Sequence, residues 1–250
     1  MYIKQTYSTS TLLREQYSDA LPHFYTIRTD YQTAGRGQAG NSWESEAGKN
    51  LLFSTLLRYV GIHATSQWRL SMLVAVALWD ALAKYLPKDR LTIKWPNDIY
   101  YGDKKLVGIL IENSLAGQYV GYSIAGIGLN INQTEWRSNA PNPISMKQIT
   151  GQEYKAEELM NEWVHAMANW EAQSTEAIQK TYLQHLYRRE GWHTYVEREV
   201  SVAPTAIAQS GIEGAFLAMF AGITPQGELI LRTTNNEEKT YHFKQIRFVL

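Results

Sequence analysis

The feature of the sequence that most restricts its fold is a change in the spacing of apolar residues after residue 86. From Thr65 to Leu86, apolar residues recur every three or four positions, which predicts a helix with one buried face. Pro87 ends this pattern, because proline cannot continue a helix. From Leu91 to Ile131 the pattern predicts strands, with tight turns at Gly102-Asp103 and Ala116-Gly117. We therefore expect an α+β fold with a mixed, largely antiparallel sheet.

The last hundred residues predict two different structures on either side of residue 190. A helical pattern runs from about Glu153 to Gln184, and its length favours two helices with a break near Gln173-Ser174. After Gly191, short strand-like segments and turns indicate a small β-barrel or sandwich. With 44% hydrophobic residues, the chain can bury one large and one small core, so we predict domains at 1–190 and 191–250. The strands expected in the second domain are Tyr195–Val202, Ala215–Ala221, Leu229–Arg232 and Tyr241–Val249.

Composition excludes several kinds of partner and chemistry. The 24 basic and 24 acidic residues balance, so the sequence does not predict a nucleic-acid partner. The absence of cysteine excludes disulfides, thiolate metal sites and cysteine nucleophiles. The N-terminal residues lack the long apolar stretch of a signal peptide, and no apolar run approaches the roughly 18 residues that span a bilayer. We therefore expect a soluble cytoplasmic protein without a membrane partner.

The segment Gly35–Gly40 matches the pattern G-x-G-x-x-G, which is found in dinucleotide-binding folds. Such a fold needs a helix that begins inside the loop, but residues 41–45 are poor helix formers and Leu51–Thr55 looks like a strand. A phosphate-binding P-loop is also excluded, because no Gly-Lys-Ser/Thr closes the motif. What remains is a flexible loop with one cation, Arg36, suited to a phosphate or carboxylate. Taken alone, the loop is better explained as an ordinary glycine-rich turn.

A second cluster, Lys94-Trp95-Pro96-Asn97-Asp98, places a cation, an aromatic ring, an amide and a carboxylate at the end of a predicted strand. Lys105 lies across the predicted hairpin from this cluster. Each residue has a simple structural explanation, with Trp95 in the core and Lys94 and Asp98 in solvent. The combination of all of them is not explained in this way.

Taken together, these motifs resemble the biotin–protein ligase family. The resemblance extends from Ser8 to the C-terminus and is weakest between Gln133 and Glu190. It implies a catalytic domain like that of class II aminoacyl-tRNA synthetases, a mixed sheet with helices on one side, followed by a small SH3-like domain. It leaves no room for the N-terminal DNA-binding domain of some relatives, so no repressor function is expected. The segments that carry it are Tyr31–Gly37, Trp43, Gly48, Lys94–Asp98, Lys105, Gly108–Glu112 and Gly126–Asn130.

The resemblance also implies a reaction and a set of site residues. Members of this family use ATP and Mg²⁺ to adenylate biotin, and then pass biotin to one lysine of a biotin carboxyl carrier protein. Lys105 and Arg36 are expected to stabilise the transition state, and Asp98 to orient or deprotonate the incoming lysine. No protein ligand is assigned to the metal. Biotin binding is expected at Ser8, Thr9, Ser10, Gln32, Gly35, Arg36, Gly37, Gln38, Trp43, Lys105 and Gly108, and adenylate binding at Arg36, Gly37, Gln38, Lys94, Asn97 and Asn130.

Some of these residues also have a structural interpretation. Ser8-Thr9-Ser10 is typical of a helix N-cap before Leu12, and this role is compatible with ligand binding. For Glu112, which ends the segment Gly108–Glu112, a structural role is the alternative to contact with a ligand. Trp136 is the aromatic residue nearest to the segment where some relatives carry an adenine-stacking tryptophan.

The glycine loop departs from several relatives, which carry further basic residues where this chain has Gln38, Ala39 and Asn41. Fewer charge-assisted hydrogen bonds would hold the phosphate, so we expect the adenylate intermediate to be released more readily.

Two alternative functions stay open, a lipoate or octanoate ligase or transferase of the same fold and a non-catalytic binding scaffold. The resemblance also leaves a homodimer open.

Overall fold

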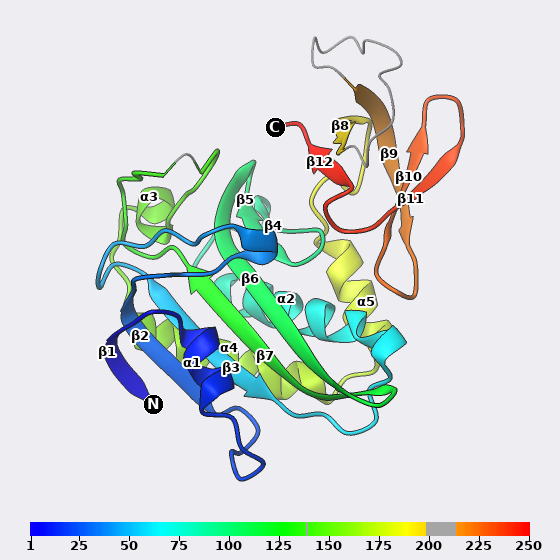
Figure 1. Ribbon diagram of the computed structural model, residues 1–250. Coiled ribbons are helices and arrows are strands. Elements are labelled where there is room, and N and C mark those ends of the chain that lie inside the picture. Colours follow the sequence, from blue (N-terminus) through cyan, green and yellow to red (C-terminus); the bar gives the residue numbers. More distant parts are fainter. Residues whose placement is uncertain (139, 199–213) are drawn as a thin grey trace. The chain divides into compact units, whose positions relative to one another are not determined.

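The computed structural model describes residues 1–138, 140–198 and 214–250 (Figure 1). These residues form two compact units, Met1–Gln184 and His185–Leu250. The domain assignment made from the sequence, with its boundary near residue 190, stays a prediction. None of the helices in the described residues is both long and apolar enough to cross a membrane.

Within the described residues of the first unit, seven strands form one sheet in the order β1-β2-β3-β7-β6-β5-β4. β1 pairs with β2 in parallel, and every other neighbouring pair is antiparallel. This confirms the mixed, largely antiparallel sheet. The sequence analysis did not identify β1 and β2. The strands are β1 (Tyr2–Thr6), β2 (Thr26–Gln32), β3 (Leu51–Leu57), β4 (Leu91–Lys94), β5 (Asp98–Tyr101), β6 (Lys104–Ala116) and β7 (Tyr119–Leu129).

The helices of this unit largely follow the predicted periodicity. The first predicted helix corresponds to α2 (Trp68–Leu82), which is shorter at both ends than expected. Residues 64–66 form a separate 3₁₀ turn, and the chain leaves the helix at Ala83, before Pro87. The predicted break near Gln173-Ser174 is confirmed, because it separates two helices. The remaining helices are α1 (Thr9–Glu15), α3 (Met146–Thr150), α4 (Ala156–Glu171) and α5 (Thr175–Gln184).

Helices cover both faces of the sheet, as β3 shows. Phe53 packs edge-on against Trp163 of α4, with ring centroids 5.0 Å apart. The next residue, Ser54, points to the opposite face and hydrogen-bonds Thr9 of α1. Figure 1 shows α1 in front of the sheet and α2 and α4 behind it. The expectation of helices on one side is therefore wrong for α1, whose Leu13 is buried against the front face.

In the described residues of the second unit, five antiparallel strands form a sheet in the order β11-β10-β9-β8-β12. This small all-β unit is consistent with the predicted SH3-like domain. Part of the predicted strand Tyr195–Val202, residues 199–202, lies outside the described residues. The single predicted strand Tyr241–Val249 is wrong: a turn at residues 242–245, with Lys244 at φ 79°, separates two strands. The strands are β8 (His193–Glu197), β9 (Ala215–Ile223), β10 (Leu229–Thr233), β11 (Glu238–Tyr241) and β12 (Ile246–Phe248).

Candidate active site

A buried cluster of hydroxyl and amide groups lies at the start of α1. Ser8 caps the helix, because its Oγ accepts a hydrogen bond from the Thr11 N–H at 3.5 Å, as predicted. The backbone N–H and the hydroxyl of Thr9 both donate to Oε1 of Gln32, at 2.8 and 3.1 Å. The hydroxyl of Ser8 also lies 3.2 Å from that of Ser10. The structure therefore brings together four of the residues predicted to bind biotin.

The sequence analysis missed Ser54, which belongs to this cluster. Its hydroxyl lies 2.8 Å from that of Thr9, and the residue is fully buried in β3. A polar residue directly after the apolar run Leu51–Phe53 was the available signal, because a buried strand seldom carries a hydroxyl without a partner.

A glycine floor extends from this cluster under Trp43. Gly108 of β6 and Gly128 of β7 are directly opposite each other in the sheet. A Cβ at either position would lie 2.5 Å from the indole of Trp43, from Cζ3 and Nε1 respectively, so any larger residue would displace the ring. Gly126, on the same face as Gly128, continues the floor to Ser10. Because Gly108 and Gly128 lack side chains, the indole of Trp43 can lie directly on the sheet beside the hydroxyl cluster.

Lys105 lies at the other end of the floor and pairs with Asp98. The Nζ–Oδ2 distance is 2.6 Å, and both side chains are largely covered. Nζ also lies 5.8 Å from the ring centroid of Trp43. Two of the three predicted catalytic residues, Lys105 and Asp98, are therefore in direct contact.

The backbone of Lys105 is held by a neighbouring segment. Its N–H donates to the Asn142 carbonyl at 2.7 Å, and its carbonyl accepts from the Ile144 N–H at 3.0 Å. Asn130, which is 1% exposed, adds hydrogen bonds from Nδ2 to the carbonyls of Lys105 and Ile144. Asn130 therefore positions Lys105 as well as lying beside it.

The glycine loop folds back on itself and rests on the second motif. Residues Gln38–Gly40 form a single 3₁₀ turn and no α-helix, in agreement with the rejection of a dinucleotide fold. Gly35 pairs with Trp43 across the loop, with Trp43 N–H donating to the Gly35 carbonyl at 2.9 Å. Nε2 of Gln38 donates to Oδ1 of Asn97 at 3.0 Å and to the Ile109 carbonyl at 3.1 Å.

Arg36 does not contact Lys105 or Asp98 in the structure. Its guanidinium donates to both carboxylate oxygens of Glu112, at 2.7 and 3.3 Å, and to the Thr11 hydroxyl. Arg14 pairs with the same carboxylate at 2.7 Å. Burial alone would raise the pKa of Glu112, but the hydrogen bonds from Arg14 and Arg36 outweigh it, and the pKa lies below its usual value.

The predicted role of Lys94 at the phosphate stays a prediction. Its ammonium donates to the Tyr100 hydroxyl at 3.2 Å and lies 4.8 Å from the centroid of that ring.

A cavity of about 410 Å³ opens beside Lys105. In the described part of the chain, the indole nitrogens of Trp43 and Trp136 and Oδ1 of Asn130 are buried without a hydrogen-bond partner. Buried polar atoms are normally paired, so their concentration at one cavity indicates a ligand with donors and acceptors. The cavity is lined by Asn41, Ser42, Trp43, Glu44, Lys105, Asn130, Trp136, Ser138, Ala140, Pro141, Asn142 and Pro143.

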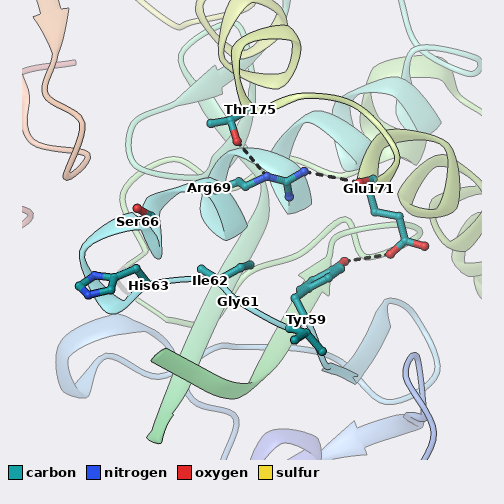
Figure 2. Close-up of a pocket in the computed structure, with 9 residues that line it drawn as sticks. Tyr59, Gly61, Ile62, His63, Ser66, Arg69, Glu171 and Thr175 are labelled. Carbon is teal, nitrogen blue, oxygen red and sulfur yellow. Dashed lines mark hydrogen bonds between the residues drawn. The ribbon is translucent and has the colours of Figure 1, made fainter. Parts of the chain in front are cut away.

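Figure 2 shows a second cavity, of about 440 Å³, which is lined by none of the predicted site residues. Arg69 there donates to Thr175 Oγ1 at 3.0 Å and to the Gln173 carbonyl at 2.9 Å. The Glu171 carboxylate accepts from the Tyr59 hydroxyl at 3.1 Å and lies 3.0 Å from Nε2 of His23. The charged groups of this cavity are therefore already paired, and the candidate active site is the one beside Lys105.

Comparison with known proteins identifies the family. Residues 2–130 match the sequence model of the biotin/lipoate A/B protein ligase family. A biotin–[acetyl-CoA-carboxylase] ligase of Paracoccus denitrificans is 34% identical over 206 residues, which cover 80% of this chain and 81% of the relative. The chain belongs to the biotin/lipoate A/B protein ligase family. The resemblance inferred from the sequence motifs is thus confirmed.

Other members of the ligase family extend the match. The bifunctional ligase/repressor BirA of Bacillus subtilis is 28% identical over 242 residues, covering 94% of this chain and 69% of the relative. The structure of the Aquifex aeolicus biotin protein ligase in complex with biotin and ATP superposes with a TM-score of 0.74. At 21% identity over all of this chain and 98% of that one, it confirms the fold.

Proposed function

We propose that the chain is an ATP-dependent biotin–protein ligase. In the first step, a carboxylate oxygen of biotin attacks the α-phosphorus of ATP, the bond to the β-phosphate breaks, and pyrophosphate leaves. In the second step, a lysine amine of a carrier protein attacks the acyl carbon of biotinyl-5'-AMP, and AMP leaves. The name of the Paracoccus relative supports an acetyl-CoA carboxylase carrier domain as the acceptor.

The observation that carries this proposal is the order of chemical groups along one face of the sheet. Hydroxyl and amide groups of Thr9 and Gln32 come first, then the floor of Gly128 under Trp43, and then the ammonium of Lys105. Biotin has the same order, with a polar ureido ring, an apolar body and tail, and a terminal carboxylate. The ureido ring would bind the cluster at α1, and the carboxylate would reach Lys105.

In adenylation, Lys105 would lower the repulsion between two anions. Its ammonium would hold the biotin carboxylate and an α-phosphoryl oxygen as they approach, and stabilise the charge that grows on the phosphate. Asp98 would fix the direction of Nζ through the 2.6 Å ion pair. The nucleotide would occupy the cavity beside Lys105, with Trp136 and Asn130 as partners for the base.

The glycine loop would close over the adenylate and exclude water. Arg36 would release the carboxylate of Glu112 and bind the phosphate instead, so that one anion replaces another as its partner. Gly37 and Gln38 would contribute backbone and amide donors, and Asn97 would hold Gln38 in place through the 3.0 Å hydrogen bond. Lys94 remains a supporting candidate for the phosphate.

In the transfer step, Asp98 is the proposed acceptor of the proton that the attacking amine must lose. Its carboxylate is the one that touches Lys105, so it lies beside the reacting carbon when the carboxyl group of biotin binds to Lys105.

A homodimer and a cytoplasmic location stay predictions.

Magnesium would enter this site with the nucleotide. Among the described residues no group of three or more His, Asp or Glu side chains could hold a metal ion. Mg²⁺ commonly uses one or two carboxylates together with substrate phosphates. We therefore expect the phosphates of ATP to supply most of the non-water ligands of Mg²⁺, and the ion to reduce the charge of the pyrophosphate leaving group.

Pyrophosphate release with ATP and either biotin or lipoate tests the proposal. Biotin-dependent release is expected, and Lys105→Ala should abolish it while the thermal unfolding curve stays unchanged. Lipoate-dependent release would favour a lipoate or octanoate ligase, and no release with either acid would favour a binding scaffold. Retained turnover in the Lys105 variant would show that the site is elsewhere.

A further inference from the structure

Glu44 joins two segments that are far apart in the sequence. One carboxylate oxygen accepts a hydrogen bond from the backbone N–H of Arg137 at 2.7 Å, and the other accepts from the N–H of Ser138 at 2.8 Å. Burial alone would raise the pKa of the Glu44 carboxyl, but these hydrogen bonds, with one from the Ser138 side chain, lower it. The group is therefore a carboxylate at neutral pH, with both oxygens engaged.

Each end of this contact adjoins a wall of the cavity beside Lys105. One residue before Glu44, Trp43 lies on the glycine floor and pairs with the glycine loop at Gly35. One residue before Arg137, Trp136 lines the cavity with an unpartnered indole nitrogen. Glu44 thus connects the wall on the biotin side with the wall on the nucleotide side.

The segment held by Glu44 is fixed independently on both sides of the contact. Before it, Oε1 of Gln133 accepts hydrogen bonds from Asn50 Nδ2 at 2.7 Å and from the Glu46 N–H at 2.9 Å. After it, the Asn142 carbonyl accepts from the Lys105 N–H at 2.7 Å. Glu44 is therefore not needed to bring the segment to the sheet. Its hydrogen bonds set the position of residues 136–138, which include Trp136 and Ser138.

We propose that Glu44 is a positioning residue that couples the position of the glycine loop to the binding of the nucleotide. This inference rests on the proposed function, because it assigns the cavity beside Lys105 to ATP. A ligand that orders Trp43 would fix Glu44, and through it the wall that carries Trp136. Coupling between two binding sites is reciprocal, so nucleotide would strengthen biotin binding to the same degree.

Substitution of Glu44 should change nucleotide affinity with little effect on the chemical step. In Glu44→Ala both backbone N–H groups lose a charged acceptor, and we expect the KM for ATP to rise about ten-fold. Glu44→Gln keeps the shape but offers one acceptor oxygen, so an intermediate rise is expected. The value of kcat and the affinity for biotin alone should stay within about two-fold of those of the natural protein. A higher KM at unchanged kcat is a result that loss of folded protein would not produce.

Glu46→Gln provides the matched control. It removes the same charge two residues further along, from an exposed side chain without a hydrogen bond or ion pair in the described part of the chain. The second measurement is the affinity for biotin with and without a non-hydrolysable ATP analogue. In the natural protein the analogue should strengthen biotin binding, and in Glu44→Ala this gain should shrink.

The outcomes separate the two proposals. An unchanged KM for ATP in both Glu44 variants, an equal rise in Glu46→Gln, or a lower kcat at unchanged KM would overturn the role of Glu44. A natural protein that binds the ATP analogue but releases no pyrophosphate with biotin would overturn the proposed function instead. In that case, the affinity for the analogue alone still measures the effect of Glu44.

Discussion

Arg36 of the glycine loop and Glu112 of β6 form a two-point ion pair, with distances of 2.7 and 3.3 Å between guanidinium and carboxylate. Glu112 also binds Arg14, so one carboxylate holds two cations. The resemblance to biotin ligases assigns Arg36 to the adenylate phosphate. A phosphate must then compete with a carboxylate that already has the geometry preferred by arginine. How tightly the loop retains the adenylate therefore depends on Glu112 as well as on the number of basic residues in the loop.

This pair predicts a defined pH dependence of stability. Because the folded protein lowers the pKa of Glu112, the pair stabilises the fold fully above the ordinary carboxyl pKa of about 4.5, and this contribution is lost as pH falls through the lower, folded pKa. Both arginines are partly exposed, so the contribution should be about 1 kcal/mol or less. Unfolding by urea between pH 3 and pH 6 measures it, and Glu112→Gln should flatten the acidic part of the curve. A curve unchanged by the substitution would mean that the pair contributes nothing to stability.

The glycine floor predicts a large effect from one added methyl group. In Gly128→Ala, the new Cβ would lie 2.5 Å from the indole nitrogen of Trp43, so the ring must move. We expect biotin to bind at least about ten-fold more weakly by calorimetry, because the ring forms one wall of the proposed pocket. Gly222→Ala is the control, since its nearest contact, with Ile230, is an ordinary 3.6 Å. Equal biotin affinity in the two variants would exclude the floor as the biotin site.

The proposed role of Asp98 predicts that its substitution slows the two half-reactions by different amounts. Asp98→Asn keeps the side-chain shape but removes both the charge that pairs with Lys105 and the proposed proton acceptor. Transfer of biotin to a carrier domain should fall by about 100-fold, within the usual range for loss of a general base, and biotin-dependent pyrophosphate release should fall much less. Single-turnover transfer from preformed biotinyl-5'-AMP measures the second step alone. Equal losses in both steps would reduce Asp98 to a residue that orients Lys105.

The sequence could predict those features that depend on local pattern. The period of α2, the break between α4 and α5, and the hairpins of β5, β6 and β7 all follow from apolar spacing and turn residues. The pairing of Lys105 with Asp98 follows from the predicted hairpin, which brings the two residues to neighbouring strands.

Long-range features were not available from such patterns. The position of α1 on the front face depends on where Leu13 finds a buried partner. β1 is mostly exposed and β2 mostly half-buried, and both carry little apolar alternation. Arg36 was expected at a phosphate because of its loop, but its partner Glu112 lies 76 positions away. The contact of Glu44 with Arg137 spans 93 positions and involves backbone N–H groups, which no side-chain motif records.

The composition of the glycine loop gives the last prediction, which the structure makes more specific. Gln38 lies where several relatives carry a basic residue, and its amide donates to Asn97 and to the Ile109 carbonyl. Both of these partners are acceptors, so an arginine in Gln38→Arg could keep one of them and direct its remaining donors to the adenylate. We expect biotinyl-5'-AMP to leave this variant several-fold more slowly, because a charge-assisted hydrogen bond is added to the intermediate. Release is measured by chasing labelled adenylate with excess biotin and ATP, and Gln38→Leu, which removes both hydrogen bonds, should release faster than the natural protein. If all three proteins release the intermediate at the same rate, then retention does not depend on position 38, and the hold on the adenylate rests on Arg36 and the backbone amides of the loop.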